Sequence, residues 1–394
     1  MRIPPPLRAA CALWIVGGAA VRSARALVTL NDGTDKIYVS GTWTMGYDSN
    51  LSASAGGSGD VSYGGSAAIE YQRRAGIIGV TSSVTFTLTD YLKSQDRTYN
   101  SLNPTFSLEL DKQSGRTTGA VTFSATRSSQ ADAAAGVHDV SWDYTTGLNL
   151  HYPVIERYSL TGSVSYGQLD YTQTSGQALV NLDTYTADVG LFYVLSDARD
   201  LSISYRYRDE ASTDNTSTVD NALLFGVYDQ LFGQIHGSLV VGLQRRAGPS
   251  EETAGVTSSG DYDDITATAT AIWNLTRQNV LTGTLSRDFT TTSTNATTDT
   301  TEATLDLTRA FNAKLSANVG VGGGENQFLG PFGFLPDTTI ERRDYYFTWN
   351  AGVNYIWSDH LKVSLAYTYL RNWSNLAFAT FDRGTYTVTL ASRW

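Results

Sequence analysis

Serine, histidine and carboxylate side chains held together form the usual machinery of hydrolysis, and this chain offers few of them. Its four histidines are His138, His151, His236 and His360. Only His138, which stands beside Asp139, is expected near the outer rim. The chain lacks a GxSxG nucleophile motif and any run with metal-ligand spacing. We therefore interpret the histidines as solvated polar residues, and expect no enzyme activity, no cofactor and no metal site.

A second set of charged residues shares one parity along alternating stretches of the chain, and acids outnumber bases on that parity. If it lines a lumen, the lumen should favour cations or neutral polar solutes over anions. If the acids lie near the rims instead, they only aid solubility. The lumen-lining candidates are the acids Glu70, Glu109, Asp143, Asp188 and Asp306, with the bases Arg206 and Arg208.

Alternating apolar and polar residues must form the elements that position these groups. The clearest stretch is 139–152, where Val140, Trp142 and Leu148 share one parity and polar residues occupy the other. A period of two indicates a β-strand, and no helical stripe of similar length competes. Eighteen such stretches occur, at 37–47, 61–72, 78–88, 105–112, 118–128, 139–152, 158–169, 183–195, 201–208, 219–228, 234–245, 264–275, 280–289, 301–309, 314–323, 344–357, 361–371 and 384–394.

The connectors between these stretches alternate between short and long. The long ones, rich in Asp, Ser, Thr, Gly and Asn, are 48–60, 90–103, 129–138, 170–182, 209–218, 246–263, 290–300, 324–343 and 372–383. Short periplasmic turns and long outer loops are typical of outer-membrane barrels. We therefore predict an all-β transmembrane antiparallel up-and-down β-barrel of about 18 strands. The rival fold is a large soluble sandwich or propeller, in which the polar faces point outward.

Composition and the first residues agree with the membrane prediction. Charged residues make up 17% of the chain, below the roughly 25% of soluble domains. Residues 1–26 read as a cleaved secretory signal, which contains the only cysteine, Cys11. We expect residues 27–394 to form a single barrel domain in the bacterial outer membrane. With 28 basic against 38 acidic residues, the chain is a poor partner for nucleic acid.

One long connector is apolar while the others are polar. It runs from Phe328 to Pro336 and includes Pro331, Phe332 and Phe334. An apolar loop at an outer surface should bury itself. It could fold into the barrel mouth as a constriction, pack against other loops, or bind a partner.

The final stretch, 384–394, has the pattern of a closing strand. Tyr386, Val388, Leu390 and Trp394 fall on its apolar face. The terminal aromatic resembles the C-terminal recognition strand of outer-membrane barrels, which implies the barrel assembly machinery as a partner. We expect this strand to pair with residues 36–47 and close the barrel.

The segment Gly46 to Asn50 (GYDSN), the eighteen strands and Trp394 resemble the β-barrel porin 2 family. The resemblance covers the whole mature chain. It implies an outer-membrane barrel, associated with exopolysaccharide or exosortase gene clusters, that lets polysaccharide or small polar solutes cross. It offers no catalytic residues.

Two classes of function follow as expectations. The first is a porin-like channel for polar solutes or for exopolysaccharide export. The alternative is a non-conducting structural or adhesion barrel that acts through its outer loops. The expected partners are outer-membrane lipid and lipopolysaccharide, the assembly machinery and, through the resemblance, polysaccharide or export components.

Deleting Trp394 should reduce insertion into the outer membrane more than it alters the fold of the barrels that do form. The measurement is the amount of surface-exposed protein, together with the heat-modifiable electrophoretic shift of folded barrels. A truncated protein present at normal surface levels would contradict the assembly role.

Overall fold

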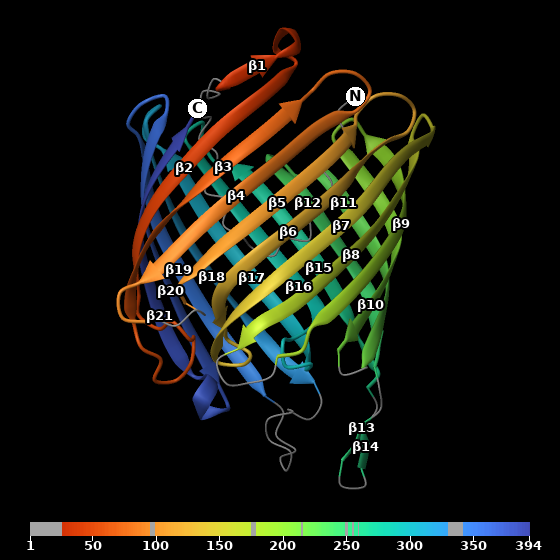
Figure 1. The fold of residues 1–394 in the computed structure, drawn as a ribbon. Coiled ribbons are helices and arrows are strands. Elements are labelled where there is room, and N and C mark those ends of the chain that lie inside the picture. Colours follow the sequence, from red (N-terminus) through yellow and green to blue (C-terminus); the bar gives the residue numbers. More distant parts are fainter. Residues whose placement is uncertain are drawn as a thin grey trace.

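The computed structural model describes residues 26–94, 99–174, 179–213, 216–248, 251–253, 256–258, 260–329 and 342–394. Their architecture is a closed antiparallel barrel of 18 strands in up-and-down order (Figure 1), which confirms the predicted fold. Within the described ranges, no helix has the length and hydrophobicity needed to cross a bilayer. The predicted signal lies outside these ranges, apart from Ala26.

Each predicted stretch corresponds to one barrel strand. The strands are β2 (Asp35–Asp48), β3 (Asp60–Arg73), β4 (Gly79–Tyr91), β5 (Ser101–Lys112), β6 (Thr118–Asp132), β7 (Val137–Ile155), β8 (Tyr158–Thr174), β9 (Leu182–Ser196), β10 (Arg199–Ser212), β11 (Ser217–Phe232), β12 (Ile235–Ala247), β15 (Tyr262–Asn274), β16 (Asn279–Thr291), β17 (Thr297–Ala310), β18 (Leu315–Leu329), β19 (Arg343–Ile356), β20 (Leu361–Ser374) and β21 (Phe381–Arg393). Smaller elements are β1 (Val28–Leu30), β13 (Glu251–Thr253), β14 (Val256–Ser258), and the 3-10 turns η1 (Asn31–Gly33) and η2 (Ala377–Ala379).

The barrel closes where β21 pairs with β2, as the sequence predicts. The backbone amide of Trp394 donates to the carbonyl of Val39 at 2.8 Å, and Val39 donates back at 2.9 Å. Beyond this point β1 pairs with β2, with Val28 opposite Ile37. No pattern of residues in the sequence predicts β1. It covers the part of the β2 edge that β21 leaves bare.

Side-chain exposure shows which face of the wall is apolar. In β4, Val84, Phe86 and Leu88 are 37%, 49% and 47% exposed on the outside, while Thr85 and Thr87 point into the barrel. The same alternation recurs from strand to strand. A soluble sandwich would bury its apolar face against a second sheet. Here that face forms an uncovered belt, so the soluble alternative is wrong.

Three of the predicted long loops are wrong in extent. Residues 129–138, 209–218 and 290–300 mostly extend the strands, and only 133–136, 213–216 and 292–296 lie between them. Serine, threonine and asparagine suggested loops, but threonine also favours strands when a neighbouring strand is available to pair. Thr291, the last residue of β16, pairs in this way with Thr297, the first residue of β17.

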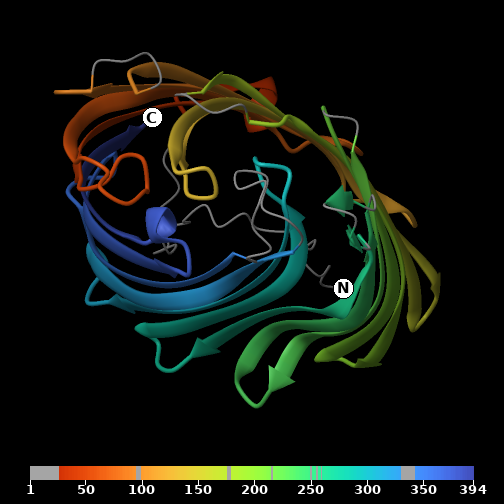
Figure 2. The ribbon, with the colours of Figure 1, turned by 90° about the horizontal axis from the view of Figure 1, so that it is seen from below.

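Two of these extended hairpins lean into the barrel instead of continuing its wall. Pairing between β5 and β6 stops at Thr105 and Thr126, and pairing between β15 and β16 stops at Ala267 and Arg287. Beyond these points the β6–β7 and β16–β17 hairpins separate from their neighbours. Figure 2, seen from the long-loop end, shows both tips inside the ring, β6–β7 in gold and β16–β17 in cyan. Pro104, which has no N–H to donate, lies at the first break.

Replacing Val84 with arginine should lower the free energy of unfolding by about 2–4 kcal/mol, because it places a charge near the middle of the apolar belt. The control Thr85→Arg points into the barrel and should change it by about 0.5 kcal/mol or less. Reversible urea unfolding in lipid vesicles measures both. Equal losses in the two variants would contradict the assigned faces.

Candidate functional site

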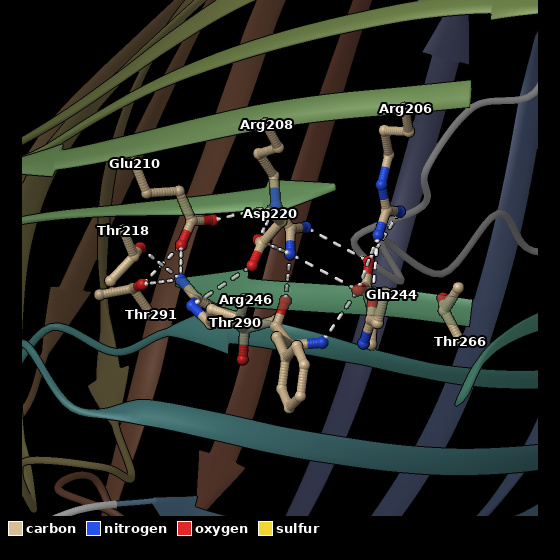
Figure 3. Close-up of polar contacts among 12 residues, drawn as sticks. Arg206, Arg208, Glu210, Thr218, Asp220, Gln244, Arg246, Thr266, Thr290 and Thr291 are labelled. Atoms are coloured by element: carbon tan, nitrogen blue, oxygen red, sulfur yellow. Dashed lines mark hydrogen bonds and ion pairs between the residues drawn. The ribbon is translucent and has the colours of Figure 1, made fainter. Parts of the chain in front are cut away.

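A cluster of buried and half-buried charges joins strands of the barrel through side-chain contacts (Figure 3). It joins three strands of one wall segment to β16, which is not adjacent to any of them in the barrel. We call it the arginine cluster. Its members are Arg206, Arg208 and Glu210 of β10, Asp220 of β11, Arg246 of β12 and Asp288 of β16.

Arg208 is the centre of this cluster. Its guanidinium lies 2.5 Å from Asp220 and 3.2 Å from Asp288, and it donates to the backbone carbonyl of Phe289 at 2.6 Å. Burial disfavours a charge there, and the surrounding carboxylates offset that cost. Two of the three contacts bring β16 against β10.

Arg246 and Arg206 complete the connection to β16. Arg246 is fully buried, pairs with Glu210, and donates to the hydroxyl of Thr291 at 2.6 Å. Arg206 binds both carboxylate oxygens of Asp288 at 3.0 Å. Such two-point contacts between arginine and carboxylate fix geometry as well as charge. The end of β16 is therefore held against the inner face of β10 and β12.

The tip of the β16–β17 hairpin reaches further across the mouth. The amide of Val180, in the segment before β9, donates to the carbonyl of Ser293 at 2.9 Å. The side-chain amide of Asn295 donates to the hydroxyl of Thr216 at 2.7 Å. The hairpin thus rests on the wall below and on two other connecting segments above.

A second bridge crosses the mouth through Arg342, which precedes β19. Its guanidinium donates to the carbonyls of Ala134 at 2.7 Å and Ala133 at 3.2 Å, at the tip of the β6–β7 hairpin. It also pairs with Asp344 at 2.6 Å. The side chain is 1% exposed. Strand order places β6–β7 and β19 far apart around the ring, so this contact spans the opening.

Of the four predicted constriction residues, Phe328 lies within the described part of the chain. It belongs to this bridge. It is 3% exposed, and the Arg342 guanidinium lies 4.3 Å from its ring centre. A cation over an aromatic face is stabilising when both are desolvated. Pro331, Phe332 and Phe334 lie outside the described residues, so the constriction role of this segment stays a prediction.

His138 is buried in the β6–β7 hairpin, so its interpretation as a solvated residue is wrong. Its Nδ1 lies 3.3 Å from the carbonyl oxygen of Leu51, its Nε2 lies 2.8 Å from the Ser129 hydroxyl, and its ring stacks on Tyr99 at 4.2 Å. The Leu51 carbonyl can only accept, so Nδ1 donates. These contacts enclose the imidazole and attach the hairpin to the loops of β2–β3 and β4–β5.

Asp139 lies beside His138 on β7, and the stacked rings of Trp142 and Tyr144 follow on the same strand. The carboxyl is 2% exposed. Burial, with a contribution from Asp132, raises the pKa of Asp139 to about 7.

The lumen-lining candidates all point inward, but the structure does not bring them together. Arg206 and Arg208 belong to the arginine cluster. Glu70 pairs with Arg393 at 2.9 Å near the short-turn end. In the part of the chain that the structure describes, Glu109, Asp143, Asp188 and Asp306 form no ion pair.

The residues of the predicted assembly signal lie on the outer surface. Tyr386, Val388, Leu390 and Trp394 are all exposed there, and the Trp394 ring stacks on His360 at 3.9 Å. Their role in assembly stays a prediction.

Sequence reasoning missed Arg246 and Arg342. For Arg246 the available signal was its position in the alternation: it shares the inward face of β12 with Gln244, whereas Arg245 lies on the outward face. Arg342 lies in a loop, where the alternation of a strand cannot predict the direction of a side chain. Both act through partners distant in sequence, and a single chain without its fold does not reveal such partners.

No family model matches the chain, and no curated protein matches its sequence. Among solved structures, the outer-membrane protein OpdK of Pseudomonas aeruginosa is similar, with a TM-score of 0.50 and 12% identity over 91% of this chain and 99% of that one. OccK2 (OpdF) of the same organism, solved with glucuronate, has a TM-score of 0.48 and 12% identity over 91% and 98%.

The FrpB iron transporter of Neisseria meningitidis gives a TM-score of 0.45 and 10% identity over 85% of this chain, which spans only 62% of that structure's length. At such identities only the shared fold of OpdK carries weight, and it agrees with the closed barrel and its apolar belt. The chain has the fold of an outer-membrane β-barrel. Membership of the β-barrel porin 2 family is not confirmed.

Replacing Arg246 with methionine should lower the free energy of unfolding by about 3–5 kcal/mol, because Arg208 alone then faces the buried carboxylates of Glu210 and Asp220 and one negative charge is left uncompensated. The matched control is Arg245→Met, one residue earlier. Arg245 is 62% exposed, and its pair with Asp261 is screened by solvent, so the loss should stay below about 1 kcal/mol. Urea unfolding in vesicles measures both. Similar losses would show that the arginine cluster does not stabilise the barrel.

Proposed function

We propose that the protein is a porin-like channel that lets small polar solutes, with a preference for cations, diffuse across the outer membrane. The observation that carries the proposal is the charge of the inner wall. Its arginines at the long-loop end are neutralised within the arginine cluster, whereas several of its acids have no basic partner among the described residues.

The acids without a basic partner are spread around the barrel. Glu109 lies on β5, Asp143 on β7 and Asp306 on β17. Asp188 on β9 differs from them, because it lies opposite Arg206 in the β9–β10 ladder and its charge is partly offset there. Negative charge on a low-dielectric wall concentrates cations in the enclosed water. This supports cation preference more strongly than the overall composition does.

The mouth supports a limit on solute size. The Arg342 bridge and the β16–β17 hairpin both lie across the opening and occupy part of it. A bulky polymer chain, which exopolysaccharide export would require, has less room to pass beside them than a small solute has.

In planar bilayers the protein should give step-like currents, with a reversal potential of cation-selective sign in a KCl gradient. The triple variant Glu109→Gln, Asp143→Asn, Asp306→Asn should reduce the cation-to-anion permeability ratio at least twofold, because it removes wall charge from the ion path. A matched triple variant in the short turns, Glu156→Gln, Asp197→Asn, Asp359→Asn, should leave it nearly unchanged.

Absence of any current would contradict the channel and favour the structural or adhesion barrel. Currents with anion preference would leave the channel standing and contradict the role of the acidic wall.

A further inference from the structure

The break between β15 and β16 leaves a slot in the barrel wall. β15 continues beyond Ala267 to Tyr262, paired only with β12. β16 continues beyond Arg287 to Thr291, paired only with β17. Because the β16 end is drawn inward by the arginine cluster, the two strand edges no longer face each other. The slot lies at the long-loop end of the apolar belt, where the headgroups of the outer leaflet begin.

Side chains, not backbone pairs, close this slot. The guanidinium of Arg287 lies 2.6 Å from Asp264 on β15 and 2.7 Å from Asp299 on β17. The hydroxyl of Thr266 donates to the Arg287 carbonyl at 3.0 Å. On the inner side Phe289 is 1% exposed, with the Tyr262 ring 6.3 Å away. Ion pairs that are about a third exposed, as the side chain of Arg287 is, can exchange partners with a ligand at modest cost.

A depression in the outward face adjoins the slot. It is open and shallow, has a volume of about 620 Å³, and crosses β10, β11, β12 and β15. We call it the lateral groove. Its lining includes the apolar side chains of Tyr205, Leu223, Leu243 and Ile265, with Arg245 and Asp264 among its polar residues. Asp264 thus belongs to both features, so the groove and the slot are continuous.

We propose that the lateral groove binds a single-chain amphiphile with an ammonium-bearing head. The apolar chain lies along Leu223, Leu243 and Ile265, where the groove is open to the hydrocarbon of the bilayer. Its head lies at the mouth of the slot beside Asp264. Packing of the chain against these side chains contributes dispersion attraction, and the charged head distinguishes this groove from the surrounding lipid.

The charge of the head follows from the residues around it. Two guanidiniums are present, Arg245 and Arg287. They face four carboxylates, because Arg245 lies 3.0 Å from Asp261 and 4.0 Å from Asp263, and Arg287 contacts Asp264 and Asp299. The excess is negative. A cationic head restores neutrality, whereas a phosphate head would add to the repulsion.

The test uses three probes with the same decyl chain: decyltrimethylammonium, decyl phosphate and decyl maltoside. Each is added below its micellar concentration to the detergent-solubilised full barrel, and adducts are counted by native mass spectrometry. We expect one saturable adduct with the ammonium probe. Asp264→Asn, which removes a carboxylate, and Leu243→Trp, which fills the groove, should each weaken its affinity about tenfold.

The matched control for the bulky variant is Leu305→Trp, on the outward face of β17 and outside the groove. It should leave binding unchanged. Tighter binding of the phosphate probe would overturn the cationic head and favour a phosphorylated lipid. No saturable adduct, or equal losses in Leu243→Trp and Leu305→Trp, would overturn the site. None of these outcomes depends on ion current, so the proposal stands or falls separately from the channel.

Discussion

Backbone hydrogen bonding inside a lipid bilayer governs the rest of this structure. Water is absent there, so every N–H and C=O in the belt must find a partner within the wall, and only a closed sheet provides one for each strand. The pairing of β21 with β2 meets that requirement, and β1 extends it where β21 ends. The wall is incomplete only toward the long-loop end, and side chains take over part of the backbone's role there. Arg127 donates to the Leu102 carbonyl, and Arg208 to that of Phe289.

The inward lean of the two hairpins is possible because the backbone ladders beside them are incomplete. A strand end that leaves its neighbour can turn into the lumen, but it needs polar contacts to replace the lost pairs. The arginine cluster supplies them for β16, and the loop contacts of His138 and Arg342 supply them for β6–β7. Concentrating the arginines at one place has a second effect. It removes their charge from the remaining wall and leaves the acids elsewhere to determine the potential in the lumen.

Strand positions and the facing of side chains were accessible from sequence because both follow from a period of two, as Val84 and Thr85 illustrate. The inward lean was not accessible. Phe289 has the parity of an outward residue, yet it is buried, because contacts to β10 override the alternation. The decisive pair, Arg208 with Asp288, joins residues 80 positions apart, and neither residue alone indicates the other. The apolar segment 328–336 drew attention as a constriction, whereas the described mouth is crossed by polar hairpins that had looked like ordinary loops.

The two short ladders have a mechanical meaning as well. Each joins its strands through only eight residue pairs, and they lie well apart around the ring. They divide the barrel into an arc from β6 to β15 and an arc from β16 through β21 and β2 to β5. At the short-turn end the two arcs are joined by continuous backbone pairing. Strain applied at the opposite end concentrates along these two lines, so the barrel resembles a tube slit from one rim, in which the halves can splay while the base keeps its shape.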